Sequence, residues 1–183
     1  MILDLVDCND PILKEKIELF DFATAGVDPI EIAANLADTM LEHNGLGLAA
    51  NQVGLRYRVF VMKATPLPIV CYNPRIVDSS TETVLLEEGC LSYPNLWVKV
   101  KRPKKIKVRY AEPNGNIVTQ VFDGMTARVF QHELDHLDGI VHTKRANKFH
   151  LEQARKNAKR INKYPRPTNL SPEAKELLDW LKA

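Results

Sequence analysis

Near the N-terminus, apolar residues recur every three or four positions, which is the spacing of one face of a helix. They are Ile30, Ala33, Ala34, Ala37, Met40 and Leu41. The preceding Asp28-Pro29-Ile30-Glu31 has the features of a helix start, with aspartate as the cap, proline at the first helical position and glutamate three residues after the cap. His43-Asn44-Gly45 follows the last periodic residue, so we expect a helix between Asp28 and His43.

The middle of the chain changes to short segments that are β-branched or alternate between apolar and polar residues, a pattern typical of strands. We expect strands at Arg58–Met62, Ile69–Tyr72, Thr83–Leu86, Trp97–Lys101, Lys105–Tyr110 and Ile117–Phe122. Pro113-Asn114-Gly115-Asn116 lies between the last two and has the composition of a turn, so these strands should form a hairpin.

Helices are expected again after the strands. From about Thr126 to Asp138, apolar residues occur on nearly all sides, which indicates a buried helix, and Gly139 is well placed to end it. A basic helix is expected over Lys148–Lys163, and Ser171-Pro172 should start a short final helix that ends near Leu181. The pattern predicts an α+β fold, with mixed, mainly antiparallel strands packed around the buried helix.

Composition narrows the class of protein. The chain has 183 residues, 45% of them hydrophobic, so one folded domain is expected. The formal net charge of +2 points to no particular partner. We expect no DNA partner, and we expect a monomer. No apolar run approaches the ~20 residues of a membrane span, and no secretion signal is visible at the N-terminus. With three cysteines, a disulfide framework is not expected, and a reducing cytoplasm is the expected location.

The strongest chemical signal is His132-Glu133-Leu134-Asp135-His136. Residues four apart share one helix face, so both imidazoles can reach one metal ion. The glutamate between them suits a general base that acts on metal-activated water. Because an unpaired buried glutamate is costly, a nearby cation is a better explanation of this helix than two ordinary histidines.

A catalytic site of this kind needs a third protein ligand, and the sequence offers two. His142 completes the pattern of a metzincin protease, His132-Glu133-x-x-His136-x-x-Gly139-x-x-His142. That pattern also requires a methionine turn after the third histidine, and no methionine follows His142. His142 therefore fits better as a surface or half-buried residue just past the helix end. A closed structural zinc site is a further alternative, but it would need four protein ligands.

The other candidate ligand is Cys90, in Glu88-Gly89-Cys90-Leu91-Ser92, since a thiolate is a good ligand for a divalent transition metal. Cys8 and Cys71 lack such a setting and are expected to be packing residues. Spacing alone leaves the choice between Cys90 and His142 open.

A third segment, Gly45-Leu46-Gly47-Leu48-Ala49-Ala50-Asn51-Gln52, would allow the backbone to approach a ligand closely. Gln52 offers an amide that could stabilise an oxyanion. The absence of a following Gly-Lys-Ser/Thr disfavours a phosphate loop, and a simple turn into a strand is the alternative.

Together, Gly45–Gln52, Glu88–Ser92 and Gln131–His136 resemble the three motifs of peptide deformylases, GxGxAAxQ, EGCLS and QHExDH, in that order. The resemblance covers about residues 2–150 and favours Cys90 as the third ligand. It implies removal of the N-formyl group from the initiator methionine of newly made polypeptides, with release of formate. It also implies iron(II) as the metal, with zinc, nickel or cobalt as substitutes.

The resemblance further implies residue roles. Cys90, His132 and His136 would hold the metal, Glu133 would be the general base, and the Gln52 amide and Leu91 backbone N–H would stabilise the oxyanion. The methionine side chain would bind among residues placed by their position in the motifs: Gly45, Leu46, Gly47, Leu86, Gly89, Met125 and Val129. We also expect Arg102 to pair with Asp135 and hold the metal helix.

The C-terminal part is basic, with nine Lys or Arg and one acid between Lys144 and Arg166. We expect residues 1–146 to form the catalytic unit and residues 147–183 a basic helical tail of the same domain. A solvated helix face explains these charges, and contact with ribosomal RNA is the functional alternative, as the resemblance also implies.

Overall fold

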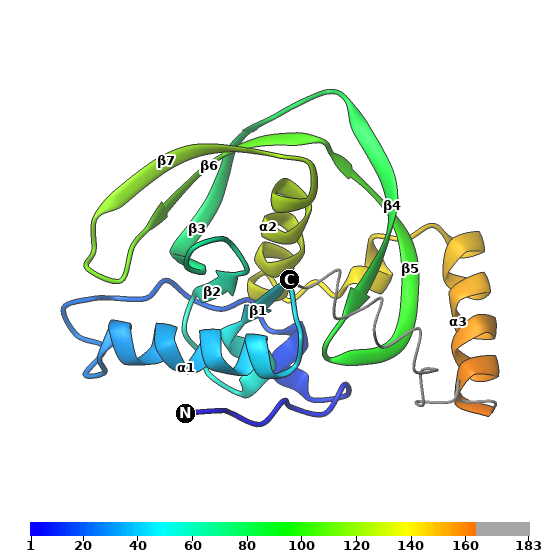
Figure 1. Cartoon of the computed structure of the whole chain (residues 1–183), viewed down its shortest axis with the longest axis horizontal. Helices are drawn as coiled ribbons and strands as arrows, with labels where there is room; N and C mark the ends of the chain where they lie inside the picture. Colours follow the sequence, from blue (N-terminus) through cyan, green and yellow to red (C-terminus); the bar gives the residue numbers. More distant parts are fainter. Residues whose placement is uncertain (164–183) are drawn as a thin grey trace, which may run out of the picture.

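The structure, a computed structural model, describes residues 1–163 of the chain. Its α-helices and strands form an α+β fold, which confirms the predicted class (Figure 1). The helices are α1 (Pro29–Glu42), α2 (Gly124–Leu137) and α3 (Lys148–Lys163). The strands are β1 (Gly47–Ala49), β2 (Val59–Met62), β3 (Ile69–Ser79), β4 (Thr83–Cys90), β5 (Tyr93–Pro103), β6 (Lys105–Ala111) and β7 (Ile117–Asp123). Short 3-10 helices lie at Pro11–Lys14, Ala50–Val53 and His142–Lys144.

The strands form two antiparallel sheets. The larger has the order β1-β2-β3-β6-β7, and the smaller is the β4–β5 hairpin. The predicted β6–β7 hairpin is confirmed, since Lys105 pairs with Asp123 and Ala111 with Ile117. Strands β6 and β7 are each one residue longer than predicted. Strands β3, β4 and β5 extend much further beyond the predicted bounds, because pairing continues past their apolar stretches through register shifts.

Helix α1 begins as predicted, because the Asp28 side chain accepts a hydrogen bond from the Ile30 N–H at 2.8 Å. The predicted apolar stripe is partly wrong: Ile30 and Leu41 are exposed, whereas Ile32 and Leu36 are buried. The buried face follows the spacing Ile32, Leu36, Met40, which packs against the cluster around β1 and β2.

Helix α2 lies between the large sheet and the β4–β5 hairpin in Figure 1. Ala127, Phe130 and Leu137 enter the hydrophobic core, and the Phe130 ring meets Phe60 edge to face, with centroids 5.0 Å apart. Helix α2 ends at Leu137 and is followed closely by Gly139, as predicted. The φ of Gly139 is +69°, and a Cβ there would lie 2.5 Å from the Lys14 carbonyl oxygen, so a side chain would not fit.

Helix α3 has the predicted bounds and packs beside β5. The final helix predicted between Ser171 and Leu181 lies outside the described residues. Within residues 1–163, no helix has the length and apolar character needed to span a membrane.

Candidate functional site

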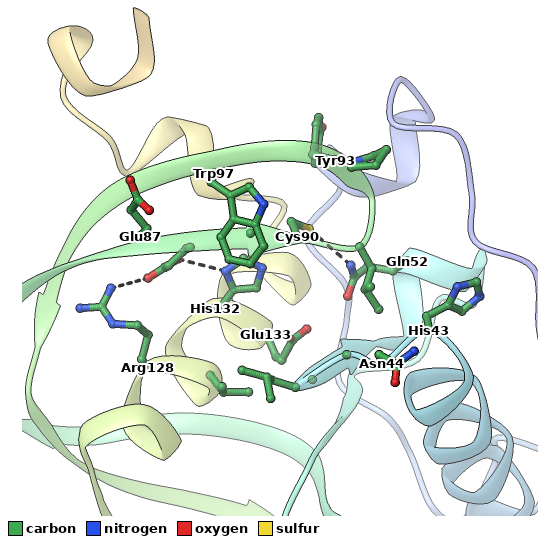
Figure 2. A pocket seen from close by; sticks show the side chains of 18 of the residues that line it. His43, Asn44, Gln52, Glu87, Cys90, Tyr93, Trp97, Arg128, His132 and Glu133 are labelled. Atoms are coloured by element: carbon green, nitrogen blue, oxygen red, sulfur yellow. Dashed lines mark hydrogen bonds and ion pairs between the residues drawn. The ribbon is translucent and has the colours of Figure 1, made fainter. Parts of the chain in front are cut away.

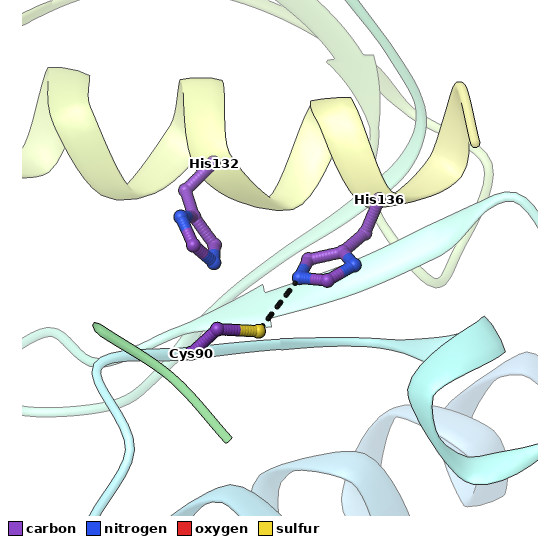
Figure 3. Close-up of side chains that lie close together, drawn as sticks. All are labelled: Cys90, His132 and His136. Carbon is purple, nitrogen blue, oxygen red and sulfur yellow. Dashed lines mark hydrogen bonds between the residues drawn. The ribbon is translucent and has the colours of Figure 1, made fainter. Parts of the chain in front are cut away.

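Cys90, His132 and His136 lie together, although they come from different elements (Figure 3). Cys90 ends β4, and the two histidines lie one turn apart on α2. Their ligand atoms all lie within 4.8 Å of one another, and Cys90 Sγ is 3.1 Å from His136 Nε2. Within the described part of the chain, this is the group of His, Cys, Asp and Glu side chains whose geometry suits a metal ion.

Glu88 fixes the orientation of the His132 ring. Its Oε2 lies 3.0 Å from His132 Nδ1. An ionised carboxylate only accepts hydrogen bonds, so Nδ1 carries the proton and Nε2 presents its lone pair to a metal. Burial alone would raise the pKa of Glu88, but hydrogen bonds from Arg102 and His132 hold that pKa well below its usual range.

Two arginines complete this buried cluster. Arg102 donates to both Glu88 oxygens, at 2.6 and 2.9 Å, and to Asp135 Oδ2 at 2.8 Å, as predicted. Arg128 donates to Glu88 Oε1 at 2.6 Å and to the carbonyls of Val84 and Val100. The cluster therefore ties the β4–β5 hairpin to α2 beneath the candidate ligands.

Glu133 is buried beside the same space, and its Oε2 has no hydrogen-bond partner. Burial, which disfavours the carboxylate, raises the pKa of Glu133 to about 7. The backbone of β1 passes so close that a Cβ on Gly47 would lie 2.5 Å from Glu133 Oε1. Glycine at position 47 thus makes room for this carboxylate.

The Gln52 side chain is held at both ends. Its Oε1 accepts the Ala49 N–H at 2.9 Å, and its Nε2 donates to Ser92 Oγ at 3.0 Å. The same Nε2 lies 3.6 Å from Cys90 Sγ, which places the amide next to the candidate metal ligands.

These groups open into a cavity of about 480 Å³ (Figure 2). Most of the predicted site residues line it: Gly45, Leu46, Gly47, Gln52, Gly89, Cys90, Leu91, Met125, Val129, His132 and Glu133. His136 lies buried behind His132 and Cys90 and does not line the cavity. Leu86 does not line it either, and its side chain is 42% exposed.

Several lining residues were not predicted from the sequence, notably Glu87, Tyr93 and Trp97. Strand pairing brings them to the site, because the β4–β5 hairpin places Tyr93 opposite Cys90. They could have been predicted from the alternation of apolar and polar positions along β5, together with the assumption that β5 pairs with the strand that contains Cys90.

His142 was expected to be a surface or half-buried residue, but it is fully buried, with only 1% of its surface exposed. It lies outside the candidate ligand group, and its Nε2 donates to the Leu96 carbonyl at 3.2 Å. Its ring packs between Tyr93 and His132, with centroid distances of 5.6 and 5.8 Å. The reason for the difference is that the 3-10 helix after α2 turns this side chain inward against β5.

The residues present fit a divalent transition metal. One thiolate and two imidazoles are a favourable donor set, and three protein ligands leave a coordination position open for chemistry. A buried carboxylate oxygen without a partner stands next to that set. The fold and the site therefore define a metal-dependent hydrolase of the His-Glu-x-x-His type.

Comparison with known proteins gives the family. A family model for polypeptide deformylase matches residues 2–152, so the chain belongs to that family. A peptide deformylase of Thermotoga neapolitana is 42% identical over 134 residues, which cover 73% of this chain and 80% of the relative. The crystal structure of peptide deformylase from Thermotoga maritima matches with a TM-score of 0.76 and 35% identity, over 80% of this chain and 99% of that one.

A second solved structure is that of a class I type b peptide deformylase from Acinetobacter baumannii with Met-Ala-Ser bound. It matches with a TM-score of 0.74 and 35% identity, over 79% of this chain and 98% of that chain. The family match over residues 2–152 includes all three sequence motifs, and the activity of this chain is that of the family, deformylation of nascent peptides.

Proposed function

We propose that the cavity hydrolyses the formamide bond of N-formylmethionyl peptides with Glu133 as the general base. The observation that carries this proposal is Glu133 Oε2, a buried carboxylate oxygen without a hydrogen-bond partner next to the Cys90-His132-His136 group. An oxygen that no protein group occupies is available to a substrate or to a water molecule.

Cys90, His132 and His136 would hold the metal, which we propose is iron(II), with zinc, nickel or cobalt as substitutes. When bound, such an ion lowers the pKa of a water molecule and supplies a nucleophile near neutral pH. Glu88 supports this arrangement, because it fixes the His132 ring with Nε2 facing Cys90.

Glu133 would accept a proton from the attacking water and then deliver it to the departing amine. Its pKa of about 7 suits both steps, because general catalysis is most efficient when the pKa lies near the working pH. Formate and a free amino terminus are then the products.

The developing oxyanion would receive hydrogen bonds from the Gln52 amide and the Leu91 backbone N–H. Gln52 Nε2 carries two hydrogens, and the one directed at Ser92 Oγ fixes where the other points. Removal of one such donor typically costs ~10²–10³ in turnover.

The methionine side chain would bind among apolar residues that line the cavity between β1 and α2. Leu46, Met125 and Val129 supply the side chains, and Gly45, Gly47 and Gly89 line the same cavity. Leu86 does not line the cavity and is not part of this proposal.

The test is formate release from formyl-Met-Ala-Ser by anaerobically purified, metal-loaded protein. We expect turnover by the natural chain and none by Cys90→Ser, which should also lose metal. Glu133→Gln should retain stoichiometric metal and lose turnover by ~10²–10⁴. Normal turnover of Glu133→Gln would remove Glu133 from this role. Cleavage of unformylated peptides without formate release would instead favour a metzincin-type protease.

We further propose that residues 1–146 are the catalytic unit and that residues 147–183 are a basic tail of the same domain, able to contact ribosomal RNA. The charge of α3 supports this, since Arg155, Lys156, Lys159 and Arg160 are all exposed. The chain would act as a monomer on formylated nascent peptides in the cytoplasm of a bacterium. An organellar stroma or matrix, or the cytosol of a phage-infected host, would offer the same substrates.

A further inference from the structure

Trp97 is a large aromatic side chain at the mouth of the cavity. It comes from β5 and lines the cavity, yet 58% of its surface is exposed. Figure 2 shows its indole ring above His132, on the side of the cavity opposite Glu133. Nothing in the proposed chemistry uses this ring.

The backbone of β4 supports one part of the indole. A Cβ on Gly89 would lie 3.0 Å from three atoms of the Trp97 six-membered ring, Cη2, Cζ2 and Cζ3. Nearly equal distances to three ring atoms mean that the ring rests flat over this position, where any side chain would crowd it. Gly89 directly precedes Cys90, so the indole is held beside the candidate metal centre.

The residue before Trp97 is also fixed. The buried His142 donates a hydrogen bond to the Leu96 carbonyl at 3.2 Å, and it packs against Tyr93 on the same strand. The exposed ring therefore stands on a backbone that is anchored from inside the molecule, which reduces the entropy lost when a ligand contacts it.

Three of the apolar residues that line the cavity form one group. Leu46, Met125 and Val129 also line a neighbouring small cavity of about 60 Å³, which shows that these three residues lie together. Trp97 is not part of that group. A volume of about 480 Å³ is enough for more than one amino-acid side chain.

We propose that Trp97 is a specificity-determining residue whose indole binds an apolar side chain, preferably aromatic, at the residue that follows formyl-methionine. This inference rests on the proposed function. With the formyl group at the metal ligands and the methionine side chain beside Met125, the rest of the peptide must leave through the open mouth. Glu87, His43 and Asn44, which also line the cavity, are polar. Tyr93 and Trp97 are the aromatic residues of the lining, and Trp97 offers the larger exposed ring, because it is 58% exposed whereas Tyr93 is half-buried.

The experiment measures kcat/KM for formyl-Met-X-Ser peptides with X as phenylalanine, leucine or glycine. We compare kcat/KM of the phenylalanine peptide with kcat/KM of the glycine peptide. Trp97→Ala should lower this ratio by roughly three- to tenfold, because it removes an aromatic contact. Trp97→Phe should retain most of that ratio. Leu85→Ala is the matched control, because Leu85 is a similarly exposed apolar residue of the same hairpin that does not line the cavity.

A binding measurement separates direct contact from an indirect effect. The sequence contains one other tryptophan, Trp180, so Trp180→Phe leaves Trp97 as the sole indole reporter. Titration of the metal-loaded protein with the deformylated peptides Met-Phe-Ser and Met-Gly-Ser should change the indole emission, with tighter binding of Met-Phe-Ser.

An equal loss for all three formylated peptides in Trp97→Ala, or equal affinity for the two product peptides, would overturn the role of Trp97. Absence of formate release from every peptide by the natural chain would instead overturn the proposed function, so the two failures are distinguishable.

Discussion

At the scale of single residues, Glu88 contributes both to the stability of the fold and to the geometry of the candidate site. Its two oxygens receive hydrogen bonds from Arg102, Arg128 and His132, and all four side chains are buried. Buried charges are tolerated only when each is paired. The same pairing fixes His132 for metal binding, so the stability of the hairpin and the geometry of the site depend on one carboxylate.

We therefore expect Arg102→Ala to lower the free energy of unfolding by about 3 kcal/mol, because it leaves Glu88 and Asp135 with less compensation inside the protein. Urea unfolding of the metal-loaded protein measures this. Lys104→Ala serves as the control, since the Lys104–Glu82 pair is exposed and should contribute less than about 1 kcal/mol. Similar losses for both variants would contradict a special role for the buried cluster.

At the scale of elements, the spacing between β1 and α2 sets the position of Glu133, the proposed general base. Gly47→Ala should place a methyl group against Glu133 and displace its carboxylate. We expect kcat to fall by about 10²-fold, as for other small misplacements of catalytic groups, with metal content and circular dichroism unchanged. Full activity of Gly47→Ala would show that the position of Glu133 tolerates such a shift.

Much of the fold could be predicted because local patterns and the tertiary structure agree. The Asp28 cap, the β6–β7 turn and the end of α2 just before Gly139 are each set by a few neighbouring residues. Most of the residues that line the cavity could be predicted for the same reason, because they belong to three short contiguous motifs.

The other features of the fold and the site depend on which strands pair and on how each helix is rotated about its axis. The pattern of apolar and polar residues along the chain does not encode either of these. Ile30 and Ile32 are both apolar residues of α1, and only docking against β1 and β2 decides that Ile32 is buried. Trp97 lines the cavity with its ring packed over Gly89 of the neighbouring strand. Likewise, nothing near His142 in the sequence indicates that it turns inward toward Leu96.

At the scale of the whole molecule, the charge is unevenly distributed despite a net value of +2. If α3 contacts ribosomal RNA, Lys156→Glu combined with Lys159→Glu should weaken ribosome association and reduce its dependence on salt. Hydrolysis of formyl-Met-Ala-Ser should not change, because neither residue lines the cavity.

The matched control is Lys107→Glu combined with Arg109→Glu on β6, which changes the net charge equally at two other exposed positions. Co-sedimentation with ribosomes across a salt series compares the two variants. An equal effect of both would indicate a general charge effect and contradict a specific role for α3.

The candidate metal ligands also have a consequence for folding. Cys90 belongs to the β4–β5 hairpin, whereas His132 and His136 belong to α2, which packs on the other sheet. An ion bound by all three acts as a removable cross-link between two separately built parts of the chain. Metal concentration then becomes a variable of stability, because an ion that binds only the folded state shifts unfolding by mass action.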